Sequence, residues 1–90
     1  MVTDLMKTYT FVLVLANVDE MTDDVLNAIY GSGVDDAMIR SEGPVVMVDF
    51  DREGETLGLA IDSAVKDVLK AGYKVARIIV EEIEQETKDE

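Results

Sequence analysis

Stretches rich in β-branched and aromatic residues divide the chain into segments typical of strands. Three such stretches cover residues 8–16, 45–51 and 73 to about 83. The first two are apolar on both faces and are therefore predicted to be central strands. Residues 36–41 alternate more weakly and predict an edge strand, which the turn sequence at residues 42–44 separates from the next strand.

Two further segments have the spacing of amphipathic helices. The first begins after Thr22, a suitable N-cap, and is stopped by Gly31 and Gly33. The second begins after Thr56 and is stopped by Gly72. In each helix the apolar residues share one face: Val25, Leu26, Ile29 and Tyr30 in the first, and Leu57, Ile61, Ala64, Val65 and Val68 in the second.

The resulting order β-α-β-β-α-β predicts an α+β fold of the ferredoxin-like kind. In this fold two helices cover one face of a four-stranded antiparallel sheet, and right-handed crossovers favour the strand order 4-1-3-2. We expect one domain over residues 1–83, followed by an acidic tail at residues 84–90.

Alternation along the strands predicts which side chains the helices leave uncovered. We assign the bulkier set, including Phe11, Phe50, Ile78 and Val80, to the helix side. The opposite face is then apolar where a wet sheet face is normally polar, which favours a homodimer or a docked partner. Its predicted residues are Val12, Val14, Val45, Met47, Val75, Arg77 and Ile79. The alternative is that loops or the first seven residues cover this face.

Charge limits the class of partner. Eight Lys and Arg stand against 20 Asp and Glu, a net charge of −12, which argues against direct binding of nucleic acid. An acidic surface is either a solvated exterior or a mimic of nucleic acid that occupies a basic groove on a partner protein. The residues predicted for this surface are Asp19, Glu20, Asp23, Asp24, Asp51, Glu53 and Glu55.

Few residues offer catalytic or metal chemistry. The chain has no Cys and no His, so thiol, imidazole and zinc-type sites are excluded. Asp49, Asp51 and Glu53 precede Gly54 in the manner of a calcium loop, but the twelfth position is Ala60. We therefore predict no catalytic, metal or cofactor site and no enzyme activity. With no signal peptide or membrane span visible, a cytoplasmic location is expected.

Three segments carry a resemblance to a known family. They are LNAIYGSGVDDAMI (residues 26–39), VDFDREGETL (48–57) and AIDSAVKDVLKAG (60–72). Together they resemble the N-terminal βαββαβ domain of small bacterial excisionase- or regulator-type helix-turn-helix proteins. The chain lacks the helix-turn-helix and has Gly54 where those proteins usually carry Ala. The resemblance implies that Phe50 anchors the core and that Arg52 pairs locally with Asp51, Glu53 or Glu55.

These observations lead to one expected function and one alternative. We expect a non-enzymatic protein-interaction or dimerisation module of a bacterial regulatory system, of the transcription-control or antitoxin-like kind. The alternative is an acidic, nucleic-acid-mimicking inhibitor of the phage anti-defence type, bound to a basic protein groove.

Overall fold

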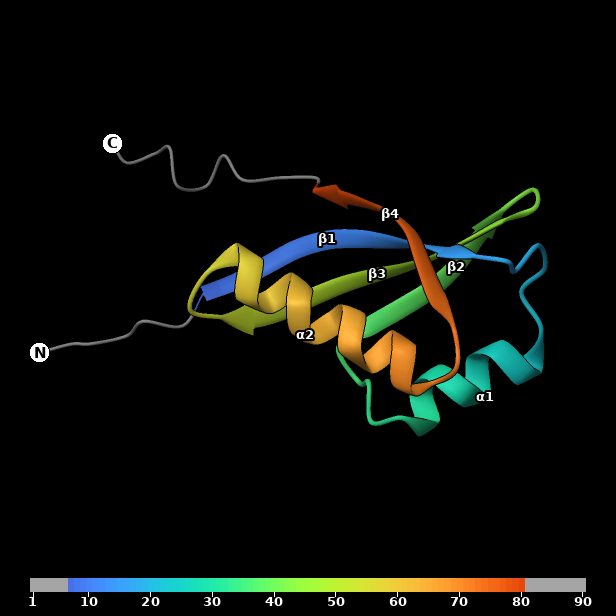
Figure 1. The fold of residues 1–90 in the computed structure, drawn as a ribbon, viewed down its shortest axis with the longest axis horizontal. Coiled ribbons are helices and arrows are strands. Elements are labelled where there is room, and N and C mark those ends of the chain that lie inside the picture. Colours follow the sequence, from blue (N-terminus) through green and yellow to red (C-terminus); the bar gives the residue numbers. More distant parts are fainter. Residues whose placement is uncertain (1–6, 81–90) are drawn as a thin grey trace, which may run out of the picture.

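The computed structural model describes residues 7–80 and has the predicted element order (Figure 1). Its sheet order, β2-β3-β1-β4, is the predicted order read from the other edge, and the fold is α+β and ferredoxin-like. All neighbouring strands are antiparallel. The predicted end of the last strand at residues 81–83 and the predicted tail at 84–90 lie outside the described residues. The elements are β1 (Lys7–Ala16), α1 (Asp23–Gly31), β2 (Ala37–Glu42), β3 (Val45–Gly54), α2 (Leu57–Lys70) and β4 (Lys74–Val80).

Both helices begin at the predicted caps. Thr22 Oγ1 accepts a hydrogen bond from the backbone N–H of Val25 at 3.3 Å, and Thr56 Oγ1 accepts one from Leu59 at 3.1 Å. These bonds satisfy N–H groups that have no partner within the first helical turn. Neither helix has the length and apolar character needed to cross a bilayer.

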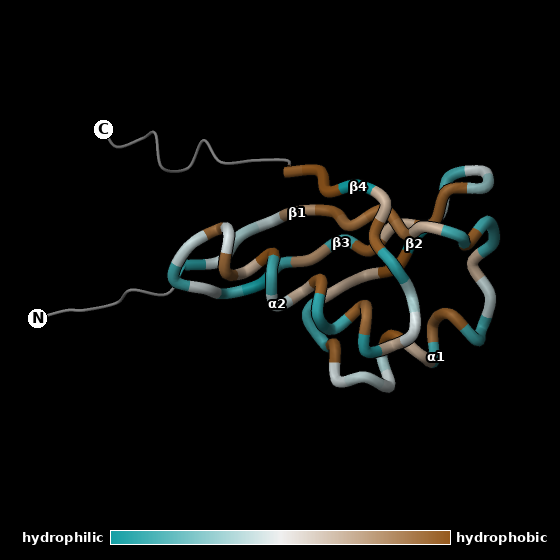
Figure 2. The backbone as a smooth tube through the Cα atoms, in the orientation of Figure 1, coloured by the Kyte–Doolittle hydropathy of each residue, from teal (hydrophilic) through white to brown (hydrophobic). Residues whose placement is uncertain are grey.

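The main core lies between the helices and one face of the sheet. Phe11 and Phe50 are cross-strand partners on β1 and β3, and their rings stack with centroids 5.5 Å apart, so Phe50 anchors the core as predicted. Figure 2 shows hydrophobic stretches along the strands and hydrophilic turns between them. The helices contribute Val25, Ile29, Ala60, Ala64 and Val68 to the same cluster.

The end of β3 differs from the predicted boundary at residue 51. It continues to Gly54 because β1 begins at Lys7 and pairs with this extension. Gly54 is buried where the strand meets the start of α2, and a Cβ built on it would lie 3.1 Å from Ala60 Cβ. The absence of a side chain therefore lets the strand end and the helix start approach closely.

Candidate interaction surface

Two rows of side chains run across the uncovered face of the sheet, from β2 to β4. The strand registers place Arg40 opposite Met47, Met47 opposite Val14, and Val14 opposite Arg77. The second row runs in the same order through Met38, Asp49, Val12 and Ile79. We call this surface, together with Val45, the open face. It therefore has an apolar centre with an arginine on each side.

The apolar centre is less accessible than predicted. Val12, Val14 and Met47 form a second small cluster and are 2–6 % exposed, with Val45 packed against them. The long side chains of Arg40 and Arg77 stand at the two ends of the central row, where their aliphatic parts can shield apolar neighbours. The accessible apolar side chains of the open face are instead Met38, 67 % exposed, and Ile79, 39 % exposed.

Val75 is a correction to the predicted open face. The pairing of β1 with β4 shifts register between Val14 and Leu15, so Val75 lies opposite Leu15 and packs against the helix-side core. A bulge of this kind inserts one residue and reverses the faces of the residues before it. Arg77 and Ile79 lie after the irregularity, opposite Val14 and Val12, and remain on the open face.

A charged network joins β2 and β3 on the open face. Arg40 Nε donates to Asp49 Oδ2 at 2.7 Å, and Arg40 Nη1 donates to Glu42 Oε2 at 2.9 Å. The hydrogen bond that Arg40 donates to Asp49 is the main reason that the pKa of Arg40 is raised above its usual value. Asp49 Oδ1 is buried and has no hydrogen-bond partner within residues 7–80. This carboxylate therefore has an unused acceptor at the middle of the sheet.

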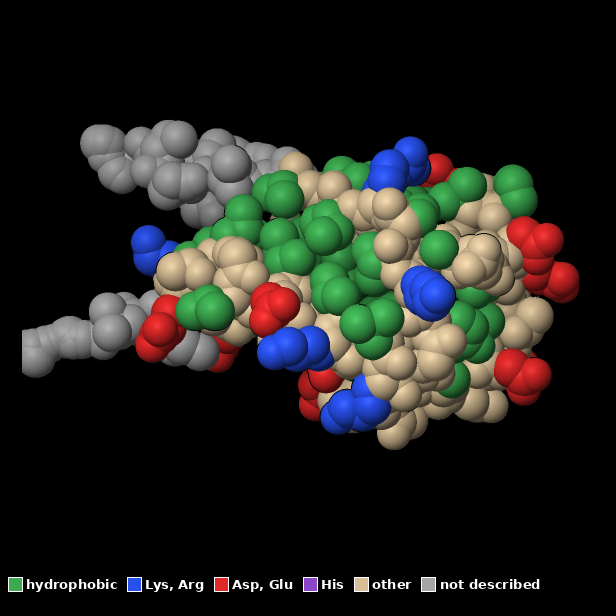
Figure 3. All heavy atoms as spheres, viewed as in Figure 1, with side chains coloured by type: hydrophobic (Ala, Val, Ile, Leu, Met, Phe, Trp, Pro, Cys, Tyr) green, Lys and Arg blue, Asp and Glu red, His purple; other side chains and the backbone are tan. Residues whose placement is uncertain are grey.

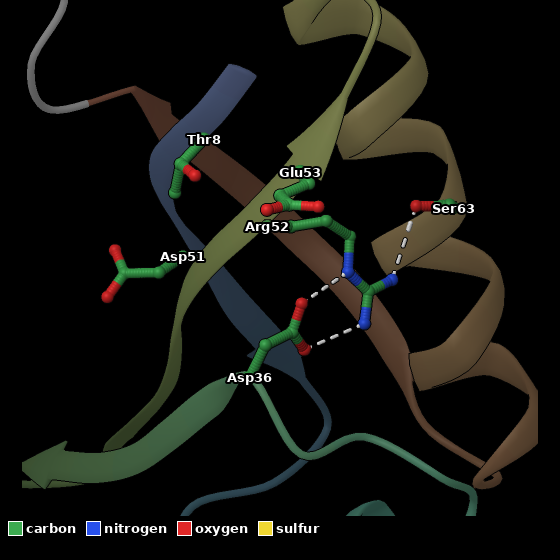
Figure 4. A pocket seen from close by; sticks show the side chains of 6 residues that line it. All are labelled: Thr8, Asp36, Asp51, Arg52, Glu53 and Ser63. Atoms are coloured by element: carbon green, nitrogen blue, oxygen red, sulfur yellow. Dashed lines mark hydrogen bonds and ion pairs between the residues drawn. The ribbon is translucent and has the colours of Figure 1, made fainter. Parts of the chain in front are cut away.

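A second charged cluster lies on the helix side and surrounds Arg52 (Figure 4). Arg52 Nε and Nη2 donate to the two oxygens of Asp36 at 2.8 and 2.9 Å. Arg52 Nη1 donates to Asp67 at 2.8 Å and to Ser63 Oγ at 3.2 Å. The guanidinium carbon also lies 4.9 Å from the ring centre of Phe50. One side chain thus connects the start of β2, the end of β3 and the middle of α2.

The expected local partners of Arg52 were wrong. Asp51 is next to Arg52 on an extended strand, so the two side chains project to opposite faces (Figure 4). Asp51 instead accepts a hydrogen bond from Thr10 Oγ1 at 2.8 Å. The hydrogen bonds from Arg52 lower the pKa of Asp36 below its usual value, against a smaller opposing effect of burial. The tertiary partner, sixteen residues away, therefore prevails over the nearer acids.

An open notch of about 570 Å³ lies beside this cluster. Asp36, Asp51, Arg52 and Glu53 line it together with Thr8 and Ser63. The guanidinium in this notch is already bonded to two carboxylates and a hydroxyl, so we assign Arg52 a structural role. The three acids of the calcium-like run, at residues 49, 51 and 53, all lie in β3, and no metal-binding group of acids occurs within residues 7–80.

The predicted acidic surface is divided between two ends of the molecule. Asp19, Glu20, Asp23 and Asp24 lie in the loop before α1 and in its first turn. The other three residues, at positions 51, 53 and 55, lie at the end of β3 and in the following turn, at the opposite end of the long axis (Figure 1). All seven are exposed, but they form two separate groups along a dimension of 44 Å.

No family model, curated protein or solved structure matches this chain. The resemblance to excisionase- or regulator-type domains accordingly stays a prediction. Sequence reasoning missed Met38, Arg40 and the Asp36–Arg52–Asp67 cluster. Alternation places Met38 and Arg40 on the same face of their strand, and pairing with residues 45–51 would have identified that face as the uncovered one.

Proposed function

We propose that this protein is a non-enzymatic protein-interaction module of a regulatory system, of the transcription-control or antitoxin-like kind, and that the open face binds its partner protein. The observation that carries the proposal is the composition of that face. Exposed Met38 and Ile79 flank a buried apolar centre, where an uncovered sheet face is normally polar.

The charged network on the open face gives the proposed docking surface a polar anchor. Asp49 and Glu42 hold the guanidinium of Arg40 in place on this face. Arg40 is already paired with Asp49 and Glu42, so Arg77 supplies the cation of the open face that is complementary to acidic or carbonyl groups on a partner.

Two matched substitutions test the proposal, because each adds one negative charge at an exposed apolar position. Met38→Glu changes the open face, whereas Leu59→Glu changes α2, where Leu59 is 55 % exposed. We expect the tagged wild-type chain and Leu59→Glu to retain the same partner from the native cell, and Met38→Glu to lose it. Equal retention by Met38→Glu and Leu59→Glu would refute docking at the open face.

The exposure of all seven predicted acidic residues supports the alternative proposal, an acidic mimic that binds a basic groove. Because the acids form two groups at opposite ends, such a mimic presents one end at a time to a compact groove. Binding through exposed charges is weakened strongly by salt. Raising NaCl from 50 to 500 mM shortens the Debye length from about 14 Å to about 4 Å. Loss of the partner over this range therefore favours the mimic, and retention favours the open face.

A further inference from the structure

β4 is an edge strand whose apolar residues are exposed on both faces. It lies at one end of the sheet order, and Ile78, Ile79 and Val80 are 46, 39 and 40 % exposed. In Figure 3 hydrophobic side chains gather over β4 and the neighbouring surface of α2. An apolar hollow of about 320 Å³ between Val65 of α2 and residues 75–78 shows that the helix covers this strand incompletely.

The two edges of the sheet are built differently. β2, at the other edge, carries Arg40 and Glu42, which are joined in an ion pair. Charged side chains are a usual protection of an edge against pairing with another strand. The last three described residues of β4 are Ile78, Ile79 and Val80, which offer no such protection.

The hydrogen-bonding directions indicate which main-chain groups of β4 face outward. The N–H of Asp51 bonds to the C=O of Asp36, so odd-numbered residues of β3 face β2 and even-numbered ones face β1. Phe50 therefore faces its partner Phe11 on β1, and the next residue of β1, Val12, faces β4. Because Val12 lies opposite Ile79, the main-chain groups of Ile79 face β1. The N–H and C=O groups of Ile78 and Val80 are therefore directed to the outer edge.

We propose that β4 pairs antiparallel with β4 of a second copy of this chain, about a two-fold axis at Ile79. In this register Ile78 lies opposite Val80 of the second copy on the helix side. Ile79 lies opposite its own copy on the open face. The sheet then continues through both molecules, and the exposed edge becomes its centre.

A second copy fits this edge better than an ordinary half-polar strand, because the added strand must be apolar on both faces. β4 exposes Ile78 and Val80 on the helix side and Ile79 on the open face, so it is itself such a strand.

This inference goes beyond the proposed function, because edge pairing uses β4, including Ile79, and leaves the rest of each open face, with Met38 at the other edge, accessible to a partner protein. It uses a different surface from the predicted homodimer through the open face, which stays a prediction. The two proposals fail separately. Met38→Glu tests docking at the open face, and substitutions in β4 test pairing.

The mass of the full chain, measured by sedimentation equilibrium from 1 to 300 µM in 150 mM NaCl, tests the pairing. We expect a monomer–dimer equilibrium. Val80→Glu should raise the dimer dissociation constant at least tenfold, whereas Met38→Glu, with the same charge change at the other edge, should change it less than threefold. Ile78→Pro removes an outward N–H that the pairing needs, so it should weaken the dimer as Val80→Glu does. Proline is tolerated at such edge positions, so the variant should still fold. Far-UV circular dichroism verifies that each variant is folded.

Three outcomes would overturn the inference. The first is a wild-type chain that stays monomeric throughout this range. The second is a dimer that both folded β4 variants leave unchanged. The third is a dimer that Met38→Glu weakens as much as Val80→Glu does, since the contact would then not lie at β4.

Discussion

Replacing Arg52 with Met removes a charged connection while retaining much of the side chain that packs on Phe50. The guanidinium makes four hydrogen bonds, two to Asp36 and one each to Asp67 and Ser63. Its loss leaves two carboxylates facing one another without the cation between them. The change therefore tests whether this cluster stabilises the junction of β2, β3 and α2.

The exposure of the three charged groups sets the expected magnitude. The side chain of Arg52 is 14 % exposed, and those of Asp36 and Asp67 are 28 and 26 % exposed. Breaking a fully buried pair costs about 3–5 kcal/mol, and breaking an exposed pair costs about 0–1 kcal/mol. Because water can reach the two carboxylates, we expect an intermediate cost: Arg52→Met should lower the free energy of unfolding by about 2–3 kcal/mol relative to wild type.

Urea unfolding followed by far-UV circular dichroism, at one fixed protein concentration, measures this loss. With an m value of about 1 kcal/mol/M for a small domain, the midpoint should fall by about 2–3 M. Arg40→Met is the matched control, because Arg40 also binds two acids but is 37 % exposed. We expect that variant to lose much less stability than Arg52→Met, because solvent screens its ion pairs. Equal losses in the two variants would refute the reasoning, since burial would then have no influence.

Three further measurements test other parts of the structure. Arg52 lowers the pKa of Asp36 in the folded protein. The stabilisation of the fold by the Asp36–Arg52 pair is therefore complete above the unfolded pKa of about 3.9 and is lost as pH falls through the folded pKa. The difference in unfolding free energy between wild type and Asp36→Asn should therefore shrink below about pH 4, and a constant difference down to pH 2 would contradict it. Gly72→Ala should lower the free energy of unfolding in urea by about 1 kcal/mol, because φ at Gly72 is +102°. Gly58→Ala lies within α2 and should raise the free energy of unfolding by about 0.5 kcal/mol. A gain in stability at both positions would contradict the strain argument. Raising NaCl from 50 to 500 mM should strengthen the β4 dimer in sedimentation, because each copy carries a net charge of −12, and a dimer weakened by salt would indicate pairing through charges instead.

The element order and the helix starts were predictable because local sequence encodes them. Thr22 and Thr56 bond to N–H groups three residues away, and alternation assigned Phe11 and Phe50 to the core face correctly. The strand order also followed, since few topologies satisfy right-handed crossovers for this sequence of elements. The bounds of β3 were less predictable, because its last residues depend on pairing with the start of β1.

The tertiary structure decided which charges meet and which apolar residues stay exposed. Arg52 has acids beside it in sequence, yet it binds Asp36 and Asp67, because strand geometry directs adjacent side chains to opposite faces. Val75 changed faces because of one register shift. The sequence by itself determined that this chain folds with one uncovered sheet face. Only the packing of α2 and the place of β4 at the edge decided where apolar surface remains accessible, since burial depends on neighbours that are distant in sequence.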